Sequence, residues 1–408
     1  MTPILDHARL IDRLQHLGAV GRGPSGGPTR LALTDADRAG RDLLAGWMRE
    51  AGLELRVDRI GNIFGVWPVP GGGDPVMVGS HIDTVIDAGI YDGCYGVLAG
   101  LAVVEALRAA GVKPARPVAV AAFTNEEGVR FQPDMMGSLV HAGGLALETA
   151  LATVGTDGAV LGEELARIGY AGELEPGAIR PACYLELHIE QGPVLEAERL
   201  AIGAVDSLQG ISWQRVTISG AANHAGTTPI AARRDAGLAA ARVITHLRDR
   251  VAGANAGTLA TVGSLRLEPG AINVIPSRAV FTVDLRDPDE ERLQAAEAAL
   301  AGFLENLAVA DGVAVSTERL ARFAPVRFDP ALVRRIAEAA ERRGHRWRHM
   351  TSGAGHDAQM IARIAPAAMI FVPSRGGISH NPAEFTAPEQ LAAGAEVLLD
   401  VVAGLVGV

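Results

Sequence analysis

One histidine and two aspartates lie around the end of a short strand that the sequence predicts. The apolar run at residues 75–79 is typical of a strand, so His81 and Asp83 are expected where the strand ends and a loop begins. Asp92 opens a long helical pattern, which places its carboxylate near a helix N-terminus. His81 and Asp92 can therefore share one metal ion, with Asp83 as an outer partner that fixes the imidazole tautomer.

Similar side chains follow three later apolar runs. Two adjacent glutamates, Glu126 and Glu127, end the run at residues 117–124, and buried carboxylates are costly unless a cation meets them. Because successive residues at a strand end point in different directions, one glutamate can bind a metal while the other meets a water molecule. His188 and His380 stand at or just after the ends of two more runs. In an open α/β sheet such positions are expected to converge on one edge.

Together these residues form a donor set of three histidines and two carboxylates: His81, Asp92, Glu127, His188 and His380. Mixed nitrogen and oxygen donors suit zinc first, with manganese, cobalt or nickel as alternatives. Five ligands are more than one tetrahedral zinc needs, so the sequence predicts two metal ions about 3.5–4 Å apart, bridged by the most central carboxylate. A single histidine at a strand end is more often a core or loop residue, but five coincidences at one edge argue against that interpretation.

Composition and charge narrow the class of protein. The chain of 408 residues is long enough for two domains, and its hydrophobic share of 48% is that of an ordinary globular protein. The net charge of -10 and the lack of a dense Lys/Arg stripe argue against nucleic acid as a partner. The N-terminus does not resemble a secretion signal, and no apolar run reaches the roughly 18 residues that span a membrane. The cytoplasm and no membrane partner are therefore expected.

The order of the expected elements predicts an α/β fold class. Up to about residue 189 strands and helices alternate, which is the pattern of a mixed, largely parallel sheet with helices on both faces. The pattern then changes to an α+β sandwich of the β-α-β-β-α-β type before the first pattern resumes. The sandwich would have strands at 211–219, 259–267, 271–286 and 313–319, and helices at 230–251 and 289–309.

This change of pattern predicts a discontinuous catalytic domain. Its first part would be residues 1–209 and its second part residues 325–408. Residues 210–324 would be inserted between them as a lid or dimerisation domain. Two cysteines, Cys94 and Cys183, are too few for a disulfide framework and cannot make a CxxC zinc site.

Six motifs of the chain resemble those of one enzyme family. GSHIDT, YDGCYG, TNEEGVRF, ELHIEQGP, NHAGTTP and ISHNP look like the two-metal amidohydrolases related to aminoacylase and glutamate carboxypeptidase. The nearest branch contains the N-carbamoyl-L-amino-acid amidohydrolases, β-ureidopropionases and allantoate amidohydrolases. The resemblance implies that His81 and His188 bind one metal and that Glu127 and His380 bind the other. It also implies that Asp92 bridges the two metals and that Glu126 is the general base.

The resemblance further implies residues that contact the substrate. His224, in a Gly/Thr loop after an expected strand, would reach the site of the neighbouring subunit in a homodimer and stabilise the oxyanion. Arg286 would bind a substrate carboxylate with its two-pronged guanidinium. The other matching positions are Gln191 and Asn273, for the carboxylate and ureido groups, and His356 and Asp357, as outer support for the ligands or the substrate.

The expected function is metal-dependent hydrolysis of a linear amide or ureido C–N bond. The first candidate is an N-carbamoyl-L-amino acid or similar ureido acid, which would give an amino acid, ammonia and carbon dioxide. Alternatives are allantoate hydrolysis, an N-acyl-amino-acid amidase or dipeptidase, and a non-catalytic protein that binds carboxylates through its metal. Glu126 beside a complete ligand set argues against the last, since a binding protein has no use for a buried base.

Overall fold

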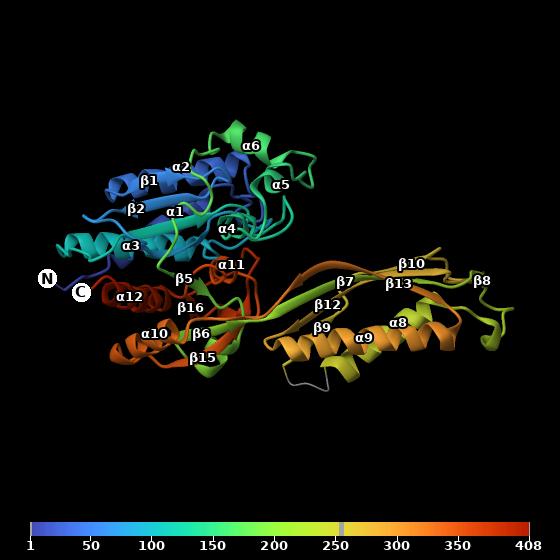
Figure 1. Ribbon diagram of the computed structural model, residues 1–408. Helices are drawn as coiled ribbons and strands as arrows, with labels where there is room; N and C mark the ends of the chain where they lie inside the picture. Colours follow the sequence, from blue (N-terminus) through green and yellow to red (C-terminus); the bar gives the residue numbers. More distant parts are fainter. Residues whose placement is uncertain (1, 253–256, 408) are drawn as a thin grey trace. The chain divides into compact units, whose positions relative to one another are not determined.

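The computed structural model describes residues 2–252 and 257–407, which form two units (Figure 1). One unit runs up to Asp206 and resumes at Phe328, and the other is Ser207–Arg327. The chain therefore enters and leaves the second unit close to the ends of the segment expected to be inserted, residues 210–324.

The first unit is built on a mixed sheet whose central strands are parallel. β4, β3, β5 and β16 lie side by side in that order, all parallel and buried along their whole length. Antiparallel strands flank them, β2 on β4 and β6 on β16. Strands buried on both faces are read in the sequence as continuous apolar runs. The strands of this sheet are β1 (Glu54–Val57), β2 (Ile63–Trp67), β3 (Val76–His81), β4 (Val118–Phe123), β5 (Cys183–Ile189), β6 (Ile202–Leu208), β14 (Val326–Arg327), β15 (Trp347–Ser352) and β16 (Ala367–Val372).

Helices cover this sheet, and the expected α/β class is confirmed. α3 packs on β3, β4 and β5 and contacts α12, while α11 packs on β5 and β16 and contacts α4. α3 is buried over nearly all of its surface, which explains why its sequence is apolar on every side. The helices are α1 (His7–Ala19), α2 (Asp35–Glu50), α3 (Cys94–Ala109), α4 (Met136–His141), α5 (Leu147–Leu151), α6 (Leu161–Ile168), α7 (Val194–Glu198), α10 (Pro330–Arg342), α11 (Asp357–Ile361) and α12 (Pro388–Leu405).

The second unit is an antiparallel sheet with two long helices on one face (Figure 1). Its strands are β7 (Gly210–Ser219), β10 (Leu265–Glu268), β12 (Arg278–Asp287) and β13 (Ala314–Phe323), with β9 (Leu259–Thr261) also paired to β12. Residues of β12 alternate between buried and half-exposed, and the buried ones pack with α8 (Ala236–His246) and α9 (Glu290–Asp311) in one core. A separate ladder joins β8 (Asn223–His224) to β11 (Val274–Ile275).

Three elements expected in this unit are interrupted, and one of them, the strand expected at 271–286, is two strands, β11 and β12. The helix expected at 230–251 begins with a short 3-10 turn, Ile230–Ala232. α8 starts anew after Asp235, because the Asp235 carboxylate accepts hydrogen bonds from the first free amides of that helix. The strand expected at 259–267 is two strands, β9 and β10, which both pair with β12. Within the part of the chain that the structure describes, no helix is long and apolar enough to cross a membrane.

Candidate metal centre

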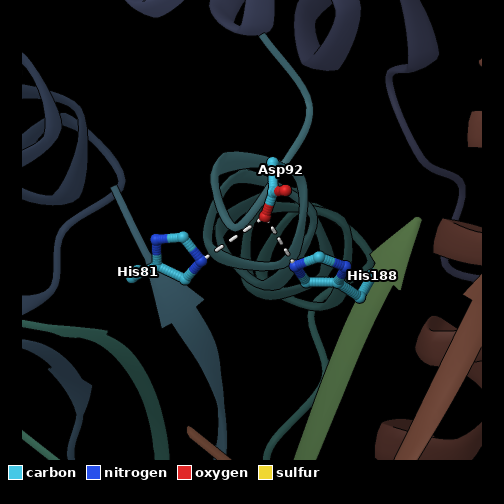
Figure 2. A group of neighbouring side chains, drawn as sticks. All are labelled: His81, Asp92 and His188. Atoms are coloured by element: carbon cyan, nitrogen blue, oxygen red, sulfur yellow. Dashed lines mark ion pairs between the residues drawn. The ribbon is translucent and has the colours of Figure 1, made fainter. Parts of the chain in front are cut away.

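The first ligand group gathers His81, Asp92 and His188 at the carboxyl ends of neighbouring strands (Figure 2). His81 ends β3, His188 lies at the end of β5, and Asp92 lies just before α3. The Nε2 atoms of His81 and His188 are 3.6 Å and 3.1 Å from Asp92 Oδ1. All three side chains are buried, and their ligand atoms lie within 4.8 Å of one another. That spacing is short enough for one ion to contact all three.

A second ligand group shares Asp92 and adds Glu127 and His380. The Nε2 atom of His380 is 3.4 Å from Asp92 Oδ2 and 3.5 Å from Glu127 Oε2. Each oxygen of Asp92 therefore faces a different ligand group. A carboxylate placed in this way can bridge two metal ions.

The hydrogen bonds of the buried histidines fit metal binding. Nδ1 of His81 donates to the main-chain carbonyl of Asp83 at 3.0 Å, and Nδ1 of His188 donates to the carbonyl of Ile189 at 2.8 Å. A carbonyl can only accept, so the neutral ring carries its proton on Nδ1 and has its lone pair on Nε2, the atom that faces Asp92. In His188 this lone pair accepts the backbone N–H of Gly93 at 3.1 Å, a contact that a metal ion would replace. Glu127 Oε1 is buried without a hydrogen-bond partner among the described residues, which a cation would satisfy. The residues therefore fit a divalent cation.

The carboxylates give the metal-free site a high affinity for positive charge. Burial alone lowers the pKa of His81, but Glu126, Asp92 and Asp83 outweigh burial and the pKa is raised well above its ordinary value. A hydrogen bond to Asp92 is the main cause that raises the pKa of His380 to about 9. Burial, followed by the charge of Asp92, raises the pKa of Glu127 to about 8. At neutral pH, protons on these groups therefore offset negative charge that a divalent cation at the same place would neutralise.

Gly93 makes the close approach of His81 to the start of α3 possible. A Cβ at this position would lie only 2.4 Å from His81 Nε2. The backbone of Gly93 also has φ of 62°, a region that favours glycine. The Asp-Gly pair of the motif is therefore explained by packing as well as by ligand chemistry.

The two adjacent glutamates diverge as the sequence predicts. Glu127 faces His380, whereas Glu126 Oε2 lies 3.3 Å from His81 Nε2 and belongs to neither ligand group. Burial is the largest of the causes that raise the pKa of Glu126 well above its ordinary value, and nearby carboxylates, led by that of Asp357, add to it. A buried carboxylate with a raised pKa can accept a proton from water and pass it on.

Asp83 supports the site differently from what was expected. Its carboxylate is 3.8 Å from the His81 ring, and it is the main-chain carbonyl of Asp83 that fixes the imidazole tautomer. The carboxylate oxygens instead accept the backbone N–H groups of Glu126 at 3.2 Å and Glu127 at 3.3 Å. Asp83 therefore ties the end of β3, which carries His81, to the loop that carries Glu126 and Glu127.

Glu384 is a site residue that the sequence interpretation missed. Its Oε1 accepts the backbone N–H groups of Tyr91 at 3.0 Å and Asp92 at 3.3 Å, and its Oε2 lies 2.9 Å from the Ser379 hydroxyl. The same hydroxyl is 2.9 Å from Asp92 Oδ2. Gly89 leaves the space, because a Cβ there would lie 2.0 Å from Glu384 Oε1. The only signal in the sequence was a glutamate four residues after His380.

Three further expected residues lie around the ligand groups in the first unit. The side-chain amide of Gln191 donates to Asp92 Oδ2 at 2.8 Å, so in this state it supports the ligand. The ring of His356 packs edge-on against that of His188, with centroids 4.6 Å apart. Asp357 is fully buried at the start of α11, and burial followed by the charge of Glu186 raises its pKa well above the ordinary value.

The second unit places the remaining expected residues at two ends of its sheet. His224 and Asn273 lie close together. His224 pairs with Val274 in the β8–β11 ladder, and the backbone N–H of the next residue, Ala225, donates to the Asn273 carbonyl at 3.0 Å. Arg286 lies near the other end of β12, on the face away from the helices, where Asp284 pairs with it at 3.0 Å. β12 begins at Arg278, three residues after the end of β11, which pairs with the strand of His224, so Arg278 marks the end of β12 nearer His224. The eight residues from Arg278 to Arg286 span about 26 Å of strand.

Comparison with known proteins identifies relatives along nearly the whole chain. A sequence model of peptidase family M20/M25/M40 matches residues 77–404. An N-carbamoyl-L-amino-acid amidohydrolase of Rhizobium meliloti is 42% identical over 398 residues, which cover 97% of this chain and 95% of the relative. An allantoate amidohydrolase of Bacillus subtilis is 35% identical, with 96% of each chain covered.

A solved structure with a similar fold supports the same grouping. It is an amidase of the hydantoinase/carbamoylase family from Burkholderia multivorans, with a TM-score of 0.94 and 44% identity. The alignment covers 99% of this chain and 98% of that chain. Both units are therefore part of the similarity.

Proposed function

The chain belongs to peptidase family M20/M25/M40, and we propose that it hydrolyses N-carbamoyl-L-amino acids to an amino acid, ammonia and carbon dioxide. The family resemblance carried by its motifs is confirmed. The chain is an amidohydrolase that acts on linear C–N bonds other than peptide bonds. The observation that supports the proposed chemistry most directly is the buried Glu126 beside two ligand groups that share Asp92.

Two divalent metal ions fit these ligand groups, with zinc first and manganese, cobalt or nickel as alternatives. His81, Asp92 and His188 would hold one ion, and Asp92, Glu127 and His380 would hold the other. Bound there, the ions would polarise the scissile carbonyl and lower the pKa of a water molecule to about 7.

Glu126 performs the proton transfers in the proposed reaction. It takes a proton from the attacking water and delivers it to the amino-acid nitrogen as the bond from that nitrogen to the carbonyl carbon breaks. The other product, carbamic acid, decomposes to ammonia and carbon dioxide. Asp83 keeps the Glu126 backbone in place, while Gln191 and Ser379 hold Asp92 Oδ2.

The second unit would bind the substrate carboxylate and stabilise the oxyanion. Arg286 offers a planar guanidinium on the open face of β12, and Asp284 orients it. His224 and Asn273 would contact the reacting ureido group. A small substrate cannot touch Arg286 and His224 of one chain, because about 26 Å of strand lies between their ends of the sheet. A homodimer in which His224 acts on the partner's site resolves this conflict.

Allantoate hydrolysis is the second candidate. It is supported by the 35% identity to the allantoate amidohydrolase of Bacillus subtilis over nearly the whole chain. Allantoate also carries a carboxylate and ureido groups, so the same donors would serve both substrates. The N-acyl amidase alternative is distinguished by its product, a carboxylic acid in place of ammonia and carbon dioxide.

The test combines metal replacement with a substrate panel. Protein stripped by a chelator is reloaded with zinc, manganese, cobalt or nickel and incubated with N-carbamoyl-L- and D-amino acids, N-carbamoyl-β-alanine, allantoate, N-acetyl amino acids and dipeptides. We expect metal-dependent release of ammonia and free amine in equal amounts from an N-carbamoyl-L-amino acid. Full activity of the metal-free protein would refute the mechanism. Faster turnover of allantoate, or of an N-acyl substrate that yields a carboxylic acid, would refute the substrate assignment.

A further inference from the structure

His224 has the opposite tautomer to the two buried histidines of the metal centre. Its Nδ1 atom accepts hydrogen bonds from the backbone N–H groups of Gly226 at 3.0 Å and Thr227 at 3.3 Å. A backbone N–H can only donate, so the Nδ1 lone pair is occupied and the proton of the neutral ring must be on Nε2. The neutral rings of His81 and His188 carry theirs on Nδ1 instead, because Nδ1 faces a main-chain carbonyl in each.

This tautomer limits what His224 can do. Its outward nitrogen is a donor, so the ring can give a hydrogen bond to a developing oxyanion. It cannot accept a proton there as a general base, nor bind a metal through Nε2 without first losing that proton. The imidazole is exposed, and its donor is therefore accessible to a ligand.

Hydrogen bonds from Thr228 and Arg233 hold the turn that imposes the tautomer. Thr228 closes it by donating its hydroxyl to the His224 carbonyl at 2.7 Å, and the backbone N–H of Thr228 reaches the same carbonyl at 3.2 Å. Arg233 then spans the turn from outside. Its Nη2 donates to the Ala225 carbonyl at 2.6 Å and its Nε donates to the Thr228 carbonyl at 3.0 Å.

We propose that Arg233 is a positioning residue that holds the turn at residues 224–228, so that His224 presents Nε2–H as a fixed hydrogen-bond donor to the substrate. A guanidinium suits this task because its nitrogens are held in one plane at fixed spacing and can grip two carbonyls at once. Lysine has a single ammonium on a flexible stem and would lose one of the two contacts. The inference rests on the proposed function only for the identity of the ligand that His224 contacts.

The tautomer itself is tested without any activity measurement. Full-length protein labelled with nitrogen-15 in its histidines is studied by long-range proton–nitrogen correlation, which distinguishes Nδ1–H from Nε2–H rings. The His224 signals are assigned by their loss in His224→Gln. We expect the Nε2–H pattern in the wild type and a mixture of tautomers in Arg233→Ala. An Nδ1–H pattern in the wild type, or an unchanged pattern in Arg233→Ala, would overturn the proposal.

The role of Arg233 in catalysis is tested by a double-mutant cycle with His224→Ala. If Arg233 acts only through His224, Arg233→Ala lowers kcat by about tenfold or more, with little change in KM, and the double variant is no slower than His224→Ala alone. Arg233→Lys should recover only part of the loss. Arg234→Ala removes the neighbouring exposed arginine and serves as the control with wild-type kcat.

The outcomes of these experiments distinguish the role proposed for Arg233 from the function proposed for the protein. Losses that multiply in the double variant would mean that Arg233 acts independently of His224, and unchanged kcat in Arg233→Ala would mean that it does not position the donor. Equal melting temperatures of the variants exclude general unfolding as the cause. If the wild-type protein hydrolyses no carbamoyl substrate, the proposed function fails, while the tautomer experiment still decides the structural claim.

Discussion

Replacement of Gly93 by alanine tests the ligand assignment through a single methyl group. The added Cβ would lie 2.4 Å from His81 Nε2, where an ordinary contact is at least 3.4 Å. The His81 ring or the start of α3 must therefore move by about 1 Å, since packed atoms do not tolerate such overlap. Metal sites need ligand distances within about 0.2 Å of their ideal values. The group of His81, Asp92 and His188 should accordingly lose its ion.

The same substitution also strains the backbone, so a matched control is needed. Alanine at φ of 62° and ψ of −50°, which lies outside the left-handed helical region, is expected to cost about 1–3 kcal/mol in the free energy of unfolding. Gly111, just beyond the other end of α3, has φ of 74° and nothing within 4 Å of the position of a Cβ. Gly111→Ala therefore also places alanine at a positive φ, but without the clash against a ligand.

The assay is metal content per chain by elemental analysis, together with kcat and the melting temperature. We expect Gly93→Ala to retain about one of the two ions proposed for the wild type and to lose at least about a hundredfold in kcat. Gly111→Ala should lose stability alone and keep both metal content and kcat. Wild-type metal content and kcat in Gly93→Ala would show that His81 Nε2 is not a metal ligand.

Three further predictions concern the base, the dimer and the protons of the site. Glu126→Gln should keep its metal content and lose about 10²–10⁴-fold in kcat. Loss of metal in that variant would make Glu126 a ligand rather than the base. Mixing Glu126→Gln with His224→Ala under conditions of subunit exchange should restore one site per heterodimer if His224 acts in trans. If activity does not recover although subunit exchange is proven, His224 acts on the site of its own chain or does not act at all. Metal binding at pH 7 should release protons, because a pKa of about 9 keeps His380 protonated in the metal-free protein and the ligand needs that lone pair. Proton release from His380 should vanish as the pH rises through about 9. Calorimetry in buffers of different ionisation enthalpy measures the number of protons that metal binding releases. An equal release of protons at pH 7 and pH 10 would contradict the raised pKa of His380.

The central sheet and the positions of the candidate ligands were predictable from local sequence. A strand buried on both faces must be apolar at every position, so β3, β4, β5 and β16 are read directly as apolar runs. Parallel strands end at a common edge, and the polar residues directly after those runs therefore meet there. No knowledge of side-chain packing was needed for either step.

The support of the ligands could not be predicted in this way. Glu384 binds the backbone of Asp92 although 292 positions separate them, and only the fold brings Gly89 close enough to leave room for it. The role of the Asp83 carboxylate also depends on a loop 43 residues away. Contacts of this kind leave no periodic pattern in the sequence, because each is a single pair fixed by the packing of whole elements.

The sequence by itself determined the chemistry of this protein: which side chains can bind metal, which can move a proton, and at which strand ends they lie. Only the tertiary structure decided how those groups are presented. The tautomers of His81 and His224 are set by whether a carbonyl or an amide faces Nδ1, and the separation of His224 from Arg286 is set by the length of β12. Residue type fixes the donors and acceptors that a side chain has, whereas the folded backbone fixes which of them remain available to a ligand.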